Sequence, residues 1–476
     1  MTRSLTEGNP TKLITSFAFT VLLGSLMNYI YNFTDSLMVG WFVNTNALGA
    51  ISAVSAPLQV LNNLSTTIIS GFSIVAGHLY GAGDHTRLRS MMANAVYLTT
   101  GITLLVTIVS LILCRPLIHL VNTPEELCDM AEIYMSIIIL AKPFAAPSWL
   151  LSSMFRALGD TKIQVSISMV NGFSNVVFNF LFLVVFPMGI AGAAIGTLCA
   201  ATLGSINYLY FLRKKVKLLH FGKKDAKPSL VMMKRLLGIS LPVGMESAVT
   251  STGSVILQTA INGHGTAAIT GVAMCGKIMN LFWLVLFAFE NSLLCFCAQN
   301  FGAGKMERVR RGIKSTLLIF LGVGGAAFVS ALFGLDNLMY MAFVGNDAQI
   351  LSFAHQDFMT NISFFPFISV LFACRTGLKA FGSTLPTLLC GVVELIARLF
   401  VSFAFSQNLQ MLFFAGPMAW VASSVFVAIL FPIVARKKEN MHQPQLETGN
   451  IADLKANESV AVASGSADEK GANTSQ

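Results

Sequence analysis

The sequence has few charged residues. Of its 476 residues only 11% are Asp, Glu, Lys or Arg, whereas 54% are hydrophobic. A soluble globular protein carries about 25% charged residues, because its surface must be compatible with water. This scarcity excludes an ordinary soluble protein and predicts that most of the surface faces lipid.

Catalytic and nucleotide-binding motifs are also missing. The chain contains no HExxH pair, no phosphate loop of the GxxxxGK[ST] kind and no Ser/His/Asp arrangement. Its eight cysteines are scattered, and no pair of them has metal-site spacing with histidines nearby. We therefore expect neither an enzyme nor a metal or organic cofactor, and any active process must draw on an ion gradient or on a partner.

Short segments of alternating polarity, which mark a membrane β-barrel, do not occur either. What is present is a series of apolar stretches, each near the length of about 20 residues that crosses a bilayer as a helix. The sequence therefore predicts an all-α polytopic membrane protein with twelve transmembrane helices. They are expected at 13–38, 48–76, 91–114, 129–152, 162–186, 188–211, 236–262, 267–298, 314–335, 351–377, 386–406 and 411–434.

The basic residues gather on one side of these helices. Segment 213–235 alone holds nine Lys/Arg, and the opposite connections carry almost none, with Arg115 as the exception. Because Lys and Arg resist translocation, the basic side is expected to be cytoplasmic, with both termini on it. The net charge of +9 then reflects orientation and contact with anionic lipid instead of nucleic-acid binding. The first apolar run lacks a cleavage site, so it is expected to be a retained helix.

The chain contains an internal repeat. HLYGAGDHTR from His78 aligns with QNFGAGKMER from Gln299 at an offset of 221, and FRALGDT from Phe155 aligns with LKAFGST from Leu378 at an offset of 223. Two such matches indicate a duplicated chain. With six spans each, both halves enter the membrane from the same side, so a pseudo-two-fold axis along the membrane normal relates them.

These patterns divide the chain into four parts. They are an N-lobe (1–212) with six helices, a basic cytoplasmic linker (213–235), a C-lobe (236–436) with six helices, and a polar tail (437–476) that is expected to be disordered.

Ionisable residues inside the predicted spans are candidate sites, because each costs about 3 kcal/mol or more at mid-bilayer. Glu394 and Arg398 are four residues apart with the acid first, which favours a structural ion pair over a transport role. Lys277 can either reach the interface or neutralise an acid, and the sequence does not decide between the two. The whole set is Asp35, Lys142, Glu246, Lys277, Glu290, Glu394 and Arg398.

Asp35 is the strongest of these candidates. It has no cationic neighbour three or four residues away, and Tyr31 and Asn32 lie on the same helix face. These oxygens can coordinate Na⁺, or the carboxylate can carry a proton. The alternative is an aspartate that caps a helix beside a loop. Glu246, just after Pro242, is the matching acid of the second half.

A polar stripe marks the fifth span. Asn171, Asn175 and Asn179 follow one another at steps of four residues, so that their amides stack on one face. The sixth span begins with GIAGAAIGT, whose small residues permit a close helix approach that brings Thr197 into the bundle. Such stripes also serve as plain interhelical contacts, and that reading stays open.

Four motifs together resemble the MATE (multidrug and toxic compound extrusion) family, and more closely its bacterial DinF-like branch. They are YNFTDSLMVG with the following ALGAISAV, the paired GAGD and GAGK loops, RALGDTK, and NVVFNFLFLVVFPMGIAGAAIGT. The resemblance covers about residues 12–435. It implies an antiporter in the plasma membrane (the bacterial inner membrane) that exports cationic or amphipathic small molecules, such as drugs, in exchange for H⁺ or Na⁺. We expect the protein to be a monomer.

The resemblance also implies a site in the N-lobe for ion or proton coupling, formed by Tyr31, Asp35, Asn175, Asn179 and Thr197. Asn32, Glu246 and Lys277 are expected to serve the substrate or a second coupling step.

The chain departs from the family pattern in three places. Asn179 stands where an aspartate is common, and Thr20 stands where a proline is common in the first helix. Glu246 lies about one turn before the acid that another branch uses.

A lipid-linked precursor or polysaccharide flippase is the alternative function. It would be expected to line the cleft with several basic residues, and Lys142 and Lys277 are too few. A receptor or scaffold without transport is a third reading, against which the duplicated lobes and buried carboxylates argue.

Overall fold

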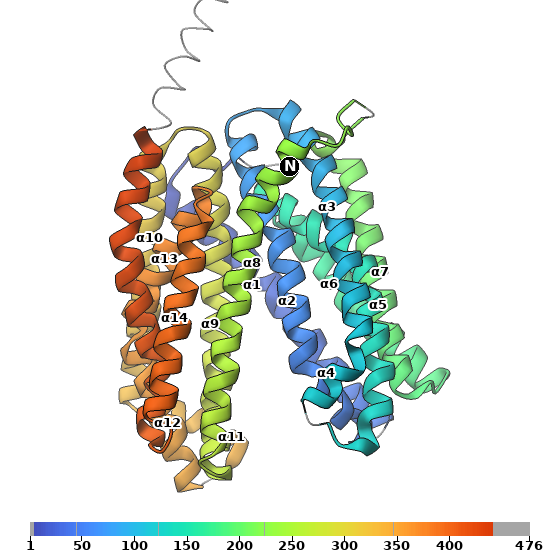
Figure 1. The fold of residues 1–476 in the computed structure, drawn as a ribbon, viewed down its shortest axis with the longest axis vertical. Coiled ribbons are helices and arrows are strands. Elements are labelled where there is room, and N and C mark those ends of the chain that lie inside the picture. Colours follow the sequence, from blue (N-terminus) through green and yellow to red (C-terminus); the bar gives the residue numbers. More distant parts are fainter. Residues whose placement is uncertain (1–3, 44, 122, 223, 346, 441–476) are drawn as a thin grey trace, which may run out of the picture. The chain divides into compact units, whose positions relative to one another are not determined.

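The computed structural model describes residues 4–440 except residues 44, 122, 223 and 346. All regular structure in this part of the chain is helical, which confirms the predicted all-α class (Figure 1). The long helices of the first half are α1 (Pro10–Phe42), α2 (Thr45–Gly81), α3 (His85–Ile112), α5 (Glu125–Ala157), α6 (Lys162–Phe180) and α7 (Gly189–Lys215). Those of the second half are α8 (Leu230–Asn262), α9 (Thr266–Gly302), α10 (Met306–Leu332), α12 (Ala348–Ser363), α13 (Phe365–Ala380) and α14 (Thr384–Ala404), followed by a helix whose described part ends at residue 440.

Among the described residues, 10 helices are long and apolar enough to cross a membrane, or 11 if the bent pair α12 and α13 is one span. The helix α8, with 33 residues, is a further one of sufficient length. The pair bends by 49° between Ser363 and Phe365, inside the single span expected at 351–377. Pro366, in the first turn of α13, has no N–H to continue the preceding helix, which explains the break.

Two short helices were not predicted. They are α4 (Cys114–Leu120) and α11 (Leu335–Val344), each directly after a long helix. Their first residues are 221 positions apart (335 − 114), which is the offset of the repeat. Both lie at the end of the molecule that is opposite the N-terminus (Figure 1).

The linker expected at 213–235 is shorter than predicted. Because α7 continues to Lys215 and α8 begins at Leu230, the connection covers 216–229 and includes the short 3₁₀ helix Lys217–Leu219. Residues 437–440, the first four of the expected tail, are part of the last helix. Residues 441–476 lie outside the described residues.

Backbone geometry supports the repeat. Gly83 and Gly304, which are 221 positions apart, have φ angles of 72° and 71°. Gly159 and Gly382, which are 223 positions apart, have φ angles of 80° and 69°. A positive φ favours glycine because it has no Cβ to collide with the backbone. The two halves therefore turn at equivalent residues in the same way.

The two lobes meet where α2 and α9 end. A Cβ atom on Gly81 would overlap the backbone carbonyl of Gln299, and one on Gly302 would overlap the backbone carbonyl of His78. Only residues without a side chain permit this approach. Along their lengths, α2 also packs against α8, and α1 packs against α9 and α10.

Two equivalent side chains bond across this contact. His78 Nε2 lies 2.6 Å from the Ala380 carbonyl oxygen at the end of α13, and Gln299 Nε2 donates to the Ala157 carbonyl oxygen at 2.6 Å at the end of α5. The repeat relates His78 to Gln299 and Ala157 to Ala380. We call this pair the cross-lobe bonds. Each satisfies a carbonyl at a helix end that the helix itself leaves without a partner.

The N-terminal arm, residues 5–8, lies against the same contact. The Leu5 N–H donates to Gln299 Oε1 at 2.9 Å, and Arg308 Nη1 donates to the Gly8 carbonyl oxygen at 2.9 Å. The arm therefore connects the start of the N-lobe to α9 and α10 of the C-lobe.

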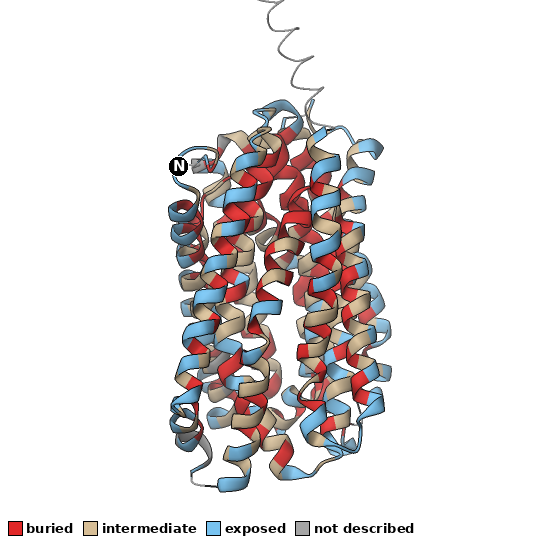
Figure 2. Ribbon diagram, turned by 90° about the vertical axis from the view of Figure 1, so that its left-hand side faces the viewer, coloured by how far each residue is buried: buried red, intermediate tan, exposed pale blue. Residues whose placement is uncertain are grey.

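Burial differs between the two ends of the helices (Figure 2). Residues 71–79 of α2 and 295–301 of α9, near the cross-lobe bonds, are all buried. Residues 247–260 of α8, toward the opposite end, are mostly exposed or half-buried. The lobes are thus closed on the side of the N-terminus, which we call the N-terminal side.

Candidate functional site

The first group of candidate residues lies inside the N-lobe, where α1 and α6 pack together. Asn179 Nδ2 donates a hydrogen bond to Asp35 Oδ1 and lies 3.3 Å from Asn175 Oδ1. Asn175 and Asn179 are buried, with 2% and 0% of their surfaces exposed. The structure therefore brings together a carboxylate of α1 and two amides of α6, an arrangement that hydrogen-bonds a charged or a protonated carboxyl.

Glycines place α7 beside this group. A Cβ atom on Gly196 would overlap Asn179 Oδ1, so the small residues of α7 permit the close approach expected from the sequence. Thr197 Oγ1 donates to the Ala193 carbonyl oxygen of its own helix at 3.1 Å. Asn179 Oδ1, by contrast, has no hydrogen-bond partner among the described residues.

The remaining predicted residues of α1 lie on the same part of the helix. Tyr31 faces Gly172 of α6, since a Cβ atom on that glycine would lie 3.4 Å from the Tyr31 Cβ. Asn32 is in the helical part of α1, but its side chain lies outside the described residues.

Two features of this region were not predicted. Tyr134 of α5 is buried and lies near Asp35. Directly after Asn179 and Phe180, the chain forms a π-helix, η1 (Leu181–Val185). Such π-turns are rare and often occur at functional sites. No motif in the sequence marks either feature.

The second group surrounds a cavity of about 820 Å³. Its walls come from α2, α8, α9, α13 and α14, with contributions from α5, α12 and the last helix. A volume of this size is typical of sites for drug-sized ligands, which occupy about 300–1,000 Å³. Among the predicted residues, Glu246, Glu394 and Arg398 line it, and so does Glu290. Lys277 is exposed on α9 and is not part of the lining.

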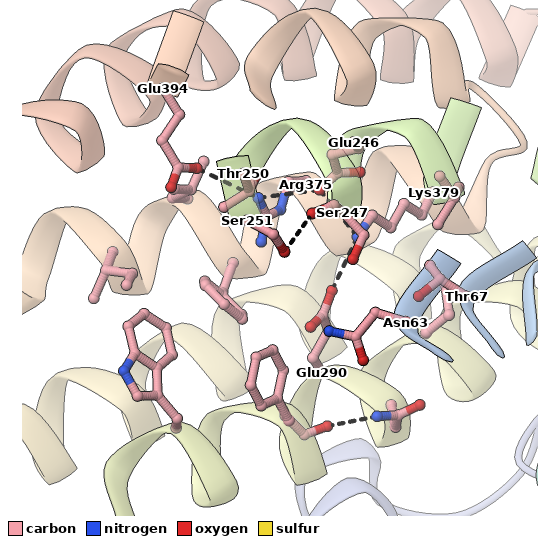
Figure 3. A pocket seen from close by; sticks show the side chains of 18 of the residues that line it. Asn63, Thr67, Glu246, Ser247, Thr250, Ser251, Glu290, Arg375, Lys379 and Glu394 are labelled. Atoms are coloured by element: carbon pink, nitrogen blue, oxygen red, sulfur yellow. Dashed lines mark hydrogen bonds and ion pairs between the residues drawn. The ribbon is translucent and has the colours of Figure 1, made fainter. Parts of the chain in front are cut away.

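Arg375 joins two carboxylates in this cavity (Figure 3). Its Nη1 lies 3.1 Å from Glu246 Oε1 and 3.8 Å from Glu394 Oε2. Arg398 Nη2 lies 2.9 Å from Glu394 Oε1, so the predicted pair is part of a larger network. All four side chains have exposed fractions of 8% or less.

Lys379 extends the network to α9. Its Nζ lies 3.3 Å from Glu246 Oε1 and 3.2 Å from Glu290 Oε1 (Figure 3). Glu246 thus faces two cations, while its Oε2 is buried and has no hydrogen-bond partner among the described residues. Three acids and three bases from α8, α9, α13 and α14 balance one another.

The sequence did not indicate Arg375 and Lys379 as site residues, because Arg375 lies at the end of the span predicted at 351–377 and Lys379 lies beyond it. Both belong to the last two turns of α13. The repeat contained the signal, because it aligns Lys379 with Arg156 (379 − 223). Arg156, in the last turn of α5, also lines the cavity.

Aromatic side chains form another part of the wall. Trp283 of α9 lies with its ring centroid 6.0 Å from Phe287, 5.9 Å from Phe372 and 6.0 Å from Trp420. The guanidinium of Arg375 lies 4.8 Å from the Phe372 ring centroid. This aromatic wall can hold a flat apolar ligand or a cation over a ring face.

The sequence and the fold both have relatives. The MatE family model matches residues 21–181 and 242–404. The probable multidrug resistance protein YpnP of Bacillus subtilis is 26% identical over 398 residues, which cover 82% of this chain and 86% of that protein. The multidrug export protein MepA of Staphylococcus aureus (strain NCTC 8325) is 21% identical over 71% of this chain and 74% of its own.

Two solved structures share the fold. A MOP superfamily transporter from Pyrococcus furiosus has a TM-score of 0.83 at 16% identity and covers 91% of this chain and 98% of its own. A mutant of the Vibrio cholerae MATE transporter VcmN has a TM-score of 0.81 at 16% identity and covers 90% and 97%.

Proposed function

The chain belongs to the MatE family, as its motifs indicated, and from this premise we propose that it is a secondary active antiporter for drug-like molecules. It exports cationic or amphipathic compounds in exchange for H⁺ or Na⁺, by alternating access between its lobes. The names of YpnP and MepA, which describe multidrug resistance and export, support this substrate class.

One observation carries the coupling part of the proposal, namely the hydrogen bond from Asn179 to the carboxylate of Asp35. On α1 the sequence has no other charged residue between Lys12 and Asp35. A lone carboxylate that is held by amides can exchange one cation or one proton with the outside as the lobes move. Because Asn179 carries no charge, Asp35 is the single acidic group of this pair.

The substrate is proposed to bind in the cavity of the C-lobe and α2. The aromatic wall accepts planar apolar groups, and Glu246 Oε2 and Glu394 offer carboxylate oxygens to a cationic group. Glu246 is proposed to contact the substrate. It is not proposed to carry the coupling ion, because it is already paired with Arg375 and Lys379.

The proposed orientation follows from charge. Arg87 and Arg89 at the start of α3 and the segment 305–311 at the start of α10 lie on the N-terminal side. If this side is cytoplasmic, the closed contact seals the inside and the cavity belongs to an outward-facing state. The protein is proposed to reside in the plasma membrane as a monomer with both termini inside.

A lipid-linked precursor flippase remains a second candidate, because the cavity is more basic than the sequence suggested. Four basic residues line it, namely Arg156, Arg375, Lys379 and Arg398. Three of them are neutralised by acids, however, which leaves one positive charge for a pyrophosphate that carries more than one negative charge. This balance favours the exporter.

The test of the proposal is transport in everted membrane vesicles. We expect uptake of a fluorescent cationic dye that is driven by a pH or Na⁺ gradient, and we expect Asp35→Asn to abolish it without changing expression. Thr20→Ala, on the same helix and distant from Asp35, serves as the control and should retain uptake. Full coupled uptake by Asp35→Asn would contradict the mechanism. Purified protein in liposomes, tested with each gradient separately, then identifies the ion.

A further inference from the structure

Arg156 is the one basic residue of the cavity that lacks an acidic partner among the described residues. It lies in the last turn of α5 and is half-buried, and it lines the cavity together with the ion-pair network. Its Nη1 donates to Ser152 Oγ at 2.8 Å, and its electrostatic neighbours are Cys295 and Tyr208. A guanidinium has five N–H donors, so this environment leaves most of them free for a ligand.

The repeat explains why the partner is missing. Lys379, the equivalent of Arg156 in the second half, is paired with Glu290 and Glu246. The first-half equivalent of Glu290 is Ile69 (290 − 221), and α1, the counterpart of α8, has no acid before Asp35. The N-lobe therefore has a basic residue, Arg156, at the position of Lys379, but the described part of this lobe has no acidic residue to pair with it.

The net charge of the cavity lining also indicates a positive charge that has no partner. Four bases (Arg156, Arg375, Lys379, Arg398) and three acids (Glu246, Glu290, Glu394) give a net charge of 4 − 3 = +1. A charge that is removed from bulk water and has no partner is costly, and a ligand that supplies the opposite charge relieves this cost.

We propose that Arg156 is an anion subsite of the cavity, which receives the carboxylate, sulfonate or phosphate group of an amphiphilic ligand. A guanidinium fits such a group because it can donate two parallel hydrogen bonds to it. The apolar part of the same molecule lies against the aromatic wall of Trp283, Phe287, Phe372 and Trp420. The substrate range then includes anionic and zwitterionic amphiphiles besides cations. This inference rests on the proposed function only in taking the cavity as the substrate site.

The experiment compares three probes with one pyrene ring system, namely pyrenebutanoate (anion), pyrenebutanol (neutral) and pyrenebutyl-trimethylammonium (cation). Binding to the full-length protein in phosphatidylcholine nanodiscs is measured by quenching of tryptophan fluorescence, without any ion gradient. The variants are Arg156→Gln and Arg156→Lys. Arg213→Gln is the matched control, because Arg213 is an exposed arginine of α7 outside the cavity lining.

We expect the wild type to bind pyrenebutanoate about 10-fold more tightly than pyrenebutanol, since hydrogen bonds between a guanidinium and a carboxylate are stronger than those to a neutral hydroxyl group. Arg156→Gln should abolish this preference and leave the Kd of pyrenebutanol within about twofold, while Arg156→Lys retains part of the preference. Arg213→Gln should behave as the wild type. If Arg156→Gln does not fold, the ratio of the two wild-type Kd values still tests the proposal.

Two results would overturn the inference. One is an unchanged Kd of pyrenebutanoate in Arg156→Gln. The other is an equal loss of affinity for all three probes in this variant, which would indicate a structural role of Arg156. A protein that binds the anion without transporting anything would contradict the proposed function alone.

A final arm separates two sources of the anionic group. Nanodiscs that contain phosphatidylglycerol are compared with phosphatidylcholine alone. If phosphatidylglycerol competes with pyrenebutanoate in the wild type, the natural occupant of the subsite is a lipid headgroup. If it does not, the occupant is a soluble amphiphile.

Discussion

At Arg375, one guanidinium bridges two carboxylates in a part of the chain where charges are scarce. Glu246 and Glu394 both lie within 4 Å of it, and Phe372 covers its face. Removing one partner of a buried ion pair leaves an uncompensated charge, which costs much more than the pair contributes. Arg375 therefore holds α8 and α14 in position around the cavity.

Arg375→Met should destabilise the protein by about 3 kcal/mol or more, which is the usual cost of breaking a buried pair. Thermal unfolding in detergent measures this as a lower midpoint. The matched control is Arg311→Met, which breaks the exposed pair with Glu307 at 3.0 Å and should cost no more than about 1 kcal/mol. Equal midpoints for the two variants would show that the network does not stabilise the fold.

Asn179 presents a different case, because its donor faces the proposed coupling acid. Asn179→Ala removes the hydrogen bond to Asp35, and a bond to a charged group contributes about 1.5–3 kcal/mol. We expect the concentration of the coupling ion at half-maximal transport to rise about 10-fold or more, measured in proteoliposomes. Asn171→Ala, two turns earlier in the same stripe, should change it by less than about twofold. The same shift in both variants would argue for a general packing effect.

The sequence predicted the residues around Asp35 better than those around the cavity. The stripe at Asn175 and Asn179 is visible as a periodicity, and Asp35 stands out because it lacks local partners. Lys379 lies beyond the span predicted at 351–377, although α13 continues to Ala380, and Arg375 lies so close to the end of that span that it does not stand out as a mid-bilayer charge. The ion pair of Lys379 with Glu290 joins residues that are 89 positions apart. A pattern within one sequence does not predict such a long-range contact.

At the scale of elements, the ends of α2 and α9 depend on glycine. Helices approach this closely only where the contact lacks side chains. The repeat predicted that the GAG loops are equivalent, and their φ angles support this. It did not predict that each loop touches the helix end of the other lobe, because that requires the packing of the two halves.

Gly302→Ala should loosen the contact between the lobes on the N-terminal side. The added Cβ would overlap the His78 carbonyl, so the helix ends must separate. Cys297, which is buried on α9 and is not part of the cavity lining, reports this opening. We expect faster labelling of Cys297 by a membrane-permeant maleimide, located by mass spectrometry. Gly101→Ala in α3, where no atom lies within 4 Å of the added Cβ, is the control. Unchanged labelling in Gly302→Ala would show that the contact tolerates the added volume.

For the molecule as a whole, the closed side is held by contacts that are distant in the sequence. The cross-lobe bonds join residues 302 and 142 positions apart. Leu5 of the N-terminal arm then adds a bond to Gln299, which itself takes part in one of them. The arm is therefore part of the contact that closes the two lobes on the N-terminal side.

Arg308→Met should weaken this closure, because Arg308 donates to the carbonyl oxygens of Leu5 at 3.3 Å and Gly8 at 2.9 Å, and to Asn300 Oδ1 at 2.8 Å. Hydrogen–deuterium exchange of backbone amides in residues 295–301 should become faster, because these buried amides of α9 exchange through local opening, which the lost contacts to the arm make easier. Arg311→Met, three residues away and paired with Glu307 at the surface, should leave the exchange unchanged. Equal exchange rates in the wild type, Arg308→Met and Arg311→Met would mean that the contacts of the arm do not stabilise the closed state.

The place of the N-terminal arm has a practical consequence for work with this protein. An affinity tag or fluorescent protein fused before Leu5 would be attached to the contact that has to open and close, and it would add bulk there. A reporter after residue 440 avoids this segment. Purification and imaging vectors should therefore carry their fusion at the carboxyl end, and activity that differs between the two fusion designs would be a simple first sign that the arm moves.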